Sequence, residues 1–308
     1  GIENNMQRIG ELAAFGTSVS WTIGALVMER SVHRIGVMAV NTLKVFFGSM
    51  YLSVLALYLN GAAFPTNVSI TAWFFIGGSA LFGFVIGDYF LFNAYALIGS
   101  RLAMLFMSIS VPLTAIAAYF IFGEALGPWA LLGMALCVSG IAITVVSGKN
   151  KQTADTHDGD NKHGRRYAKG VTFGLLSGVS MAASTLLTKR GAAGVDPVSA
   201  TQIRILCACA GFIIFAAVTR KTGEIRSAFG DRYAIGLTAV GGVFGPFVGV
   251  GLLLFAIQNA DAGIVSTLSS FTPVLIIPPS ILLFRKKVSA GEIIGAMIAV
   301  SGVALLFV

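Results

Sequence analysis

Apolar residues fall along the chain in long runs that are almost free of charge and are separated by short polar breaks. About 20 such residues, wound as a helix, cross the roughly 30 Å hydrocarbon core of a bilayer. Lipid offers the backbone no hydrogen-bonding partner, and continuously apolar runs fit helices rather than alternating strands. The pattern predicts an all-α integral membrane protein with ten transmembrane helices, at residues 12–28, 35–59, 71–98, 102–122, 128–147, 170–188, 197–219, 233–258, 262–284 and 289–308.

The composition agrees with a membrane protein and excludes a water-soluble enzyme. Of the 308 residues 56% are hydrophobic and 11% are charged, whereas about 25% charged residues are usual in soluble chains. Lysine and arginine outnumber aspartate and glutamate by 21 to 13. The basic residues lie between apolar runs and form no basic domain with aromatics, which argues against a nucleic-acid partner.

One long polar segment, residues 148–169, divides the chain into two halves, 1–147 and 170–308. The halves are similar in sequence: at an offset of 160, Lys44 falls on Arg204, Trp73 on Tyr233 and Ala96 on Ala256. At an offset of 162, Val138-Ser139-Gly140 falls on Val300-Ser301-Gly302. Because each half has an odd number of spans, the second copy must enter the membrane from the opposite side. The fold prediction is therefore two inverted five-helix repeats, which can expose a central site to each side in turn.

The cations indicate an orientation. On one side of the predicted spans lie three, and on the other lie sixteen, six of which are in the segment 148–169. The remaining two, Lys44 and Arg204, lie inside spans. Positively charged loops face the cytoplasm, so the segment 148–169 is expected there and both termini outside. The sixteen include Arg30, Arg34, Arg101, Arg220, Lys221, Arg226, Arg232, Arg285, Lys286 and Lys287.

The chain resembles the drug/metabolite transporter superfamily, and within it the paired EamA-domain transporters, over essentially its whole length. The resemblance is carried by the ten-span duplication and by a pattern near the end of each half. In the first half this is Ser110-Val-Pro112, Phe122-Gly-Glu124, Gly133 and Ser139-Gly140; in the second it is Phe271-Thr-Pro273, Phe284, Gly295 and Ser301-Gly302. The stretch from Ile86 to Arg101 is similar to a common bacterial branch. The second half departs from the pattern, with Arg285-Lys286 in place of Gly-Glu.

The resemblance implies export or exchange of small metabolites through a bacterial cytoplasmic membrane. Members handle amino acids, nucleotide sugars, amines and drugs, and the resemblance does not choose among these. It implies a small-molecule substrate, the lipid bilayer as surroundings, and a proton or counter-substrate as the second transported species. No cofactor, metal or nucleic acid is expected, and a monomer or weak homodimer is the expected assembly.

Two charged residues inside the first half are expected to meet. Lys44 lies about 13 Å deep in the span 35–59, and Asp88 lies about 15 Å from the same face in the span 71–98, at 1.5 Å per residue. Buried charges are costly in a membrane, so each is a functional candidate. Their ion pair could couple substrate or proton binding to conformation. The alternatives are a permanent pair that holds two helices together, or two side chains that reach the interface separately.

Arg204 has no carboxylate counterpart in the second half, where Val248 is taken to match Asp88. An unpaired cation favours an anionic substrate group such as a carboxylate, although backbone carbonyls or Gln202 could also satisfy it. This asymmetry favours an amphoteric or carboxylate-bearing metabolite over a lipophilic cation.

Helical spacing places Phe84, Asp88, Phe92 and Tyr95 on one face, which could hold a planar ring or an amine, or pack against neighbouring helices. Trp21 lies in the middle of the first span, where small multidrug relatives carry a coupling carboxylate, and this departure argues against proton antiport through that span. Ser108 and Ser269 lie near prolines that free helix carbonyls, and they could face the site or bond to their own helix. The glycine series at 83–87 and 241–249 predicts close helix packing.

The sequence therefore favours a secondary transporter that exports or exchanges a small polar metabolite such as an amino acid by alternating access. Uptake, or multidrug and amine transport on the same fold, is the alternative within this class. A membrane enzyme would need converging catalytic side chains and a channel would show flux without saturation; both are less favoured. No nucleotide-binding motif indicates direct use of ATP.

Overall fold

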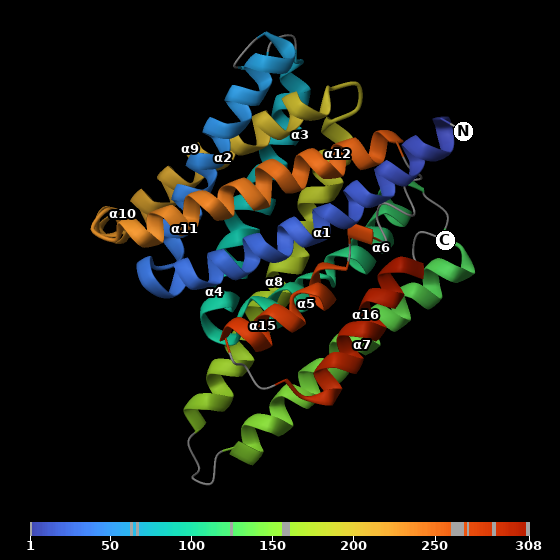
Figure 1. Cartoon of the computed structure of the whole chain (residues 1–308), viewed down its shortest axis with the longest axis vertical. Coiled ribbons are helices and arrows are strands. Elements are labelled where there is room, and N and C mark those ends of the chain that lie inside the picture. Colours follow the sequence, from blue (N-terminus) through green and yellow to red (C-terminus); the bar gives the residue numbers. More distant parts are fainter. Residues whose placement is uncertain are drawn as a thin grey trace.

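Every secondary-structure element in the described part of this computed structural model is a helix (Figure 1). The structure describes residues 2–61, 64–65, 68–123, 126–155, 161–259, 268–269, 271–284 and 288–305. The first half contains α1 (Ile2–Ile35), α2 (Val37–Asn60), α3 (Ile70–Ala80), η1 (Leu81–Gly87), α4 (Asp88–Ile98), α5 (Ser100–Met107), α6 (Ser110–Phe122) and α7 (Pro128–Asp155). The second contains α8 (Asn161–Gly191), α9 (Pro197–Val218), α10 (Thr222–Ala228), α11 (Arg232–Gly242), η2 (Val243–Gly249), α12 (Val250–Asn259), α14 (Thr272–Leu275), α15 (Ile277–Phe284) and α16 (Ala290–Leu305).

Eight helical stretches of 20 to 30 residues are long and apolar enough to cross a membrane. They correspond to the first eight predicted spans, and α3, η1 and α4 together form one of them. Two shorter apolar helices, Thr272–Leu282 and Ala290–Leu305, lie within the last two predicted spans. Part of the span 262–284 is outside the described residues, so the number ten stays a prediction. The segment 148–169 is helical where it is described, as extensions of α7 and α8.

Helix ends follow local chemistry. Gly36 has φ +84° before α2, and Gly61 has φ +68° after it, a conformation that side chains with a Cβ rarely adopt. The side chains of Ser69 and Asp231 accept hydrogen bonds from the backbone N–H groups at the starts of α3 and α11. Short caps of this kind let one long helix follow another with few connecting residues.

The first helix of each half packs against helices of the other half. α1 packs along α11, η2 and α12 of the second half, and its counterpart α8 packs along α3, η1 and α4 of the first. Equivalent helices also pack on one another, α2 on α9 and α7 on α16 (Figure 1). Reciprocal contacts of this kind are those of a two-fold arrangement.

The equivalent helices α7 and α16 run in opposite directions. Along their contact, Gly291 lies against Ser147 and Gly302 lies against Cys137, so numbers rise in one helix as they fall in the other. A Cβ on Gly140 would clash with the backbone of Ala299. These glycines let the two backbones touch, as small residues do between membrane helices.

The helix ends correct the register of the repeat. α2 and α9 begin 160 residues apart, but the capping residues Ser69 and Asp231 are 162 apart, as are the starts of η1 and η2. The offset between the halves therefore changes from 160 to 162 before α3. The sequence analysis extended the offset of 160 as far as Ala96, which is too far. In this register Val250, and not Val248, matches Asp88, and the pairing of Trp73 with Tyr233 was wrong.

The largest buried apolar cluster joins α1, α2, α4, α5 and α11 near the end of the bundle at which α1 finishes. Its members include Met28, Leu43, Phe92, Tyr95 and Ala234. Lys44 and Asp88, described next, lie on α2 and α4, two of the helices that build this cluster.

Candidate functional site

Lys44 and Asp88 form a buried ion pair between α2 and the first residue of α4. Their exposed fractions are 7% and 6%. The contact predicted from their depths is therefore present. Because each charge is removed from water, each depends on the other, and losing one partner leaves an uncompensated buried charge.

Aromatic rings surround the Lys44 ammonium. Its Nζ lies 4.6 Å from the ring centroid of Phe92 and 5.8 Å from that of Phe84. Tyr95 packs edge-to-face on Phe92 at 4.9 Å, and its hydroxyl lies 3.2 Å from the sulfur of Met104. The predicted aromatic face thus lies against the lysine, and a desolvated cation over such a ring gains about 2 kcal/mol or more.

Arg204 of α9 reaches the same cluster from the second half. Its guanidinium lies 5.1 Å from the ring centroid of Phe84, so the cations at equivalent positions of the two halves share one aromatic ring. A terminal guanidinium nitrogen donates to Ser184 Oγ at 3.1 Å, and Ser184 in turn donates to the carbonyl of Ser79 at 2.7 Å. The Nε of Arg204 is buried and has no hydrogen-bond acceptor among the described residues.

The cluster therefore carries a net charge of +1, from Lys44, Asp88 and Arg204. Asp88 interacts with Arg204 electrostatically, yet it is paired with Lys44. Among the described residues no carboxylate forms an ion pair with Arg204. No group of three or more metal-ligating side chains occurs in the searched part of the chain.

Two π-helical turns, η1 and η2, occupy equivalent places in the two halves. Segments with this wider turn inside α-helices are frequent at functional sites. A Cβ on Gly83 of η1 would lie 2.5 Å from Ser184 Oγ and 3.3 Å from the Arg204 guanidinium. Gly83 is therefore needed for Arg204 and Ser184 to occupy their positions.

Trp21 lies at the other π-helical turn. Its indole packs directly on Gly249 of η2, and Gly24, one turn further along α1, faces Gly245. The neighbouring Ser20 donates to the carbonyl of Phe244 at 2.6 Å. The structure brings Trp21 to the contact between the halves, and its role in substrate binding stays a prediction.

The two predicted serines differ in what can be said of them. Ser108 lies between α5 and α6 and donates to the carbonyl of Leu105 at 2.5 Å, so its hydroxyl bonds to its own helix. Ser269 is half-buried, and its carbonyl accepts a hydrogen bond from Thr272 at 3.3 Å. Glu124, Arg285 and Lys286 lie outside the described residues. The roles of the two serines stay predictions.

Sequence reasoning missed two buried carboxylates. Glu29, 1% exposed, accepts hydrogen bonds from the backbone N–H of Ser100 at 2.9 Å and from its hydroxyl at 2.5 Å. Glu292 forms a 2.6 Å ion pair with Arg101, and both are buried. Arg101, counted from the sequence as a loop cation, is therefore inside the bundle. All of these residues lie at the ends of apolar runs, where charged groups are ordinarily hydrated.

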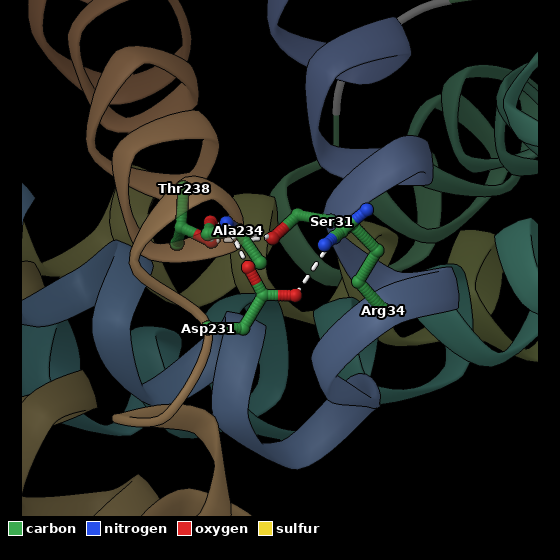
Figure 2. Close-up of polar contacts among 5 residues, drawn as sticks. All are labelled: Ser31, Arg34, Asp231, Ala234 and Thr238. Atoms are coloured by element: carbon green, nitrogen blue, oxygen red, sulfur yellow. Dashed lines mark hydrogen bonds and ion pairs between the residues drawn. The ribbon is translucent and has the colours of Figure 1, made fainter.

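A polar contact joins the end of α1 to the start of α11 (Figure 2). Arg34 donates to Asp231 at 2.8 Å, and the Ser31 and Thr238 hydroxyls lie 2.6 Å apart. The hydrogen bond from Arg34 holds the pKa of Asp231 below its ordinary value, and the backbone N–H of Ala234 adds to this effect. At the same end of the bundle, Glu224 of α10 accepts from the first turn of α2, so several contacts join the halves there.

Comparison with known proteins agrees with this arrangement. Residues 8–146 and again residues 168–308 match the EamA-like transporter family. The crystal structure of another protein is similar over 96% of this chain and 95% of that chain, with a TM-score of 0.63 at 18% identity, and shows the same fold. No curated protein matches the sequence.

Two similar sets of apolar helices that exchange their first members, with charged groups buried where they meet, define a two-repeat membrane transporter. The chain belongs to the EamA-like transporter family, and the resemblance seen in the sequence is confirmed. It is a multi-pass membrane protein of the drug/metabolite transporter type.

Proposed function

We propose that this transporter exports or exchanges a small polar metabolite, such as an amino acid, across the bacterial cytoplasmic membrane by alternating access. Ten crossing helices form two inverted five-helix repeats, residues 1–147 and 170–308. The linker at 148–169 lies in the cytoplasm and both termini lie outside. A gradient of protons or of a counter-substrate supplies the energy.

The arrangement of the halves supports this proposal. The equivalent helices α7 and α16 run in opposite directions, and α1 and α8 are exchanged between the halves. A two-fold related pair can adopt one state open to each side, in which the same contacts are made by opposite partners. Glycines lie at contacts between the halves, such as Gly24 against Gly245, and side chains this small offer little steric resistance to movement.

The observation that carries the proposal is the meeting of charges from both halves on Phe84. Lys44 and Asp88 come from the first half and Arg204 comes from the second. When the halves move relative to each other, these distances must change. A substrate or proton that binds one arrangement more tightly than the other shifts the population between the two states.

The test begins with the substrate class. Purified protein is screened for thermal stabilisation by amino acids, amines, nucleosides and sugars, because a ligand that binds only the folded state raises the unfolding temperature. A stabilising compound is then used for counterflow in proteoliposomes. Saturable counterflow is expected, and flux that rises without limit would indicate a channel instead.

Substitutions test whether the charged cluster of Lys44, Asp88 and Arg204 takes part in transport. Asp88→Asn and Arg204→Gln are expected to reduce counterflow strongly. Arg190→Gln is the matched control, because Arg190 is exposed and lies over Phe75, away from the cluster. Counterflow and pH dependence that are unchanged in Asp88→Asn would rule out Asp88 as a coupling residue, and equal losses in all three variants would argue against a site at the cluster.

A further inference from the structure

The Arg204 guanidinium has a hydrogen-bond acceptor at a terminal nitrogen but none at Nε among the described residues. Its face lies on Phe84 and one terminal nitrogen donates to Ser184, but the buried Nε has no acceptor in the described part of the chain. A hydrogen bond left unmade at a buried charged group costs more free energy than one left unmade at a neutral group. The state in which an acceptor reaches this nitrogen recovers that cost.

A carboxylate is the acceptor that suits such a group. Two parallel hydrogen bonds from a guanidinium to a carboxylate are short and charge-assisted, and they fix the orientation of the bound group. Ser184 Oγ accepts from a terminal nitrogen of Arg204 and donates to the carbonyl of Ser79, and in the described part of the chain it makes no hydrogen bond with Nε. The position of Arg204 is set from both sides, by Ser184 and by the room that Gly83 leaves.

The charge of the cluster limits the net charge of the substrate. Lys44, Asp88 and Arg204, the charged groups that the described contacts gather around Phe84 and Phe92, sum to +1, and uncompensated charge is costly there. The buried carboxylate of Glu29 accepts hydrogen bonds from Ser100 and is not counted among them. One net negative charge on the substrate brings the occupied site to zero. A zwitterion leaves it at +1, an amine raises it to +2, and a phosphate monoester, at about −1.5 to −2, overshoots.

We infer that the substrate is a carboxylate with a net charge of −1, such as a 2-oxo acid or an acidic amino acid, and that its carboxylate binds the Nε edge of Arg204. This inference rests on the proposed transport function and narrows it. Neutral amino acids and amines are then poor substrates, although they share the size of the preferred ones.

The experiment compares matched pairs that differ in charge and little in shape. Glutamate is compared with glutamine, and 4-methyl-2-oxopentanoate with leucine, first by thermal stabilisation of the wild-type protein and then by counterflow in proteoliposomes. The monoanion of each pair is expected to bind with at least about tenfold higher affinity than its partner, because the partner lacks a charge-assisted hydrogen bond. Equal or tighter binding of the neutral partner overturns the inference.

Substitution of Arg204 gives a second test. Arg204→Gln is expected to abolish the preference for the monoanion, and Arg204→Lys to keep a weaker one, because lysine retains the charge without the planar pair of donors. A monoanion preference that is unchanged in Arg204→Gln overturns the inference. The wild-type comparison needs no variant, so a folding defect in Arg204→Gln does not affect it.

The inference and the proposed function fail differently. If glutamine or leucine shows saturable counterflow equal to that of its anionic partner, the charge assignment is wrong and transport stands. If no compound of the broader screen, of any charge class, shows saturable flux, the proposed function is wrong as well.

Discussion

Lys44 of α2 and Asp88 of α4 pair where the π-helical segment η1 ends, so the ion pair joins the second span to the middle of the third. Asp88 directly follows η1. Phe84 lies within η1, and its ring centroid is 5.8 Å from Lys44 Nζ and 5.1 Å from the Arg204 guanidinium. The ring that both cations contact and the carboxylate that pairs with Lys44 therefore lie within one short stretch of the chain.

Replacing Asp88 by Asn is expected to destabilise the protein by about 3–5 kcal/mol, because Lys44 is left buried without a counter-charge. The double variant Lys44→Met with Asp88→Asn removes both charges and should recover most of that loss. Thermal unfolding in detergent measures this. Counterflow separates the two roles: a double variant that is stable and still transports contains a pair that only holds helices together, and one that is stable and inactive has lost a coupling pair.

Replacing Gly83 by Ala is expected to cost about 1–3 kcal/mol and to weaken substrate binding, because the new Cβ displaces Ser184 and with it Arg204. Gly245→Ala is the matched control at the equivalent position of η2, where a Cβ has no neighbour within 4 Å. Unfolding temperature and ligand affinity are measured for both variants. Equal effects at the two glycines would show that Ser184 and Arg204 move aside easily.

Glu292→Gln is expected to lower the free energy of unfolding by about 3–5 kcal/mol, because Arg101 is buried and loses its partner. Glu11→Gln makes the same chemical change at a half-buried position near the start of α1, and a surface-like change is usually within about 0.5 kcal/mol. Thermal unfolding of both variants gives the comparison. Matching unfolding temperatures for Glu292→Gln and wild type would mean that the Arg101 ion pair contributes no stability.

The Arg34–Asp231 contact predicts a dependence of stability on pH. The pKa of Asp231 is lower in the folded protein than its ordinary value, chiefly because Arg34 donates a hydrogen bond to the carboxylate. Its stabilisation is therefore complete above the unfolded-state pKa of about 3.9 and is lost as the pH falls through the folded-state value.

Asp231→Asn keeps an N-cap and removes the charge. The difference in unfolding temperature between this variant and wild type should be constant from about pH 5 to 8 and should shrink below about pH 4. A difference that grows as the pH falls would contradict the assigned sign.

The sequence alone predicted the fold class, most of the spans and the main ion pair. Apolar runs of membrane length indicate membrane-spanning helices. The rise of 1.5 Å per residue gave similar depths for Lys44 and Asp88, which predicted that they meet. The shared Phe84 was harder to predict, because Arg204 reaches it from the other half of the chain. The spacing of apolar residues within one half does not indicate which residues of the other half pack against it.

The remaining features depend on tertiary structure. A π-helical turn adds one residue to a turn, which shifts the phase of an amphipathic pattern. Because η1 and η2 lie within runs that are apolar on every face, the shift gives no visible signal in the sequence. Glu29, Arg101 and Glu292 lie at the ends of apolar runs, and only the packed helices show that they are buried. The offset of 162 residues between the halves is shown by Ser69 and Asp231, which cap the equivalent helices α3 and α11.

The contact between α7 and α16 is made by the same positions on both sides, with Gly133 and Gly295 as one equivalent pair and Gly140 and Gly302 as the other. Such a surface is complementary to itself when one copy is turned over. Two separate half-length chains inserted in opposite senses could associate through it just as the fused halves do. In the single chain the two copies need not be identical, and they differ at Asp88 and Val250.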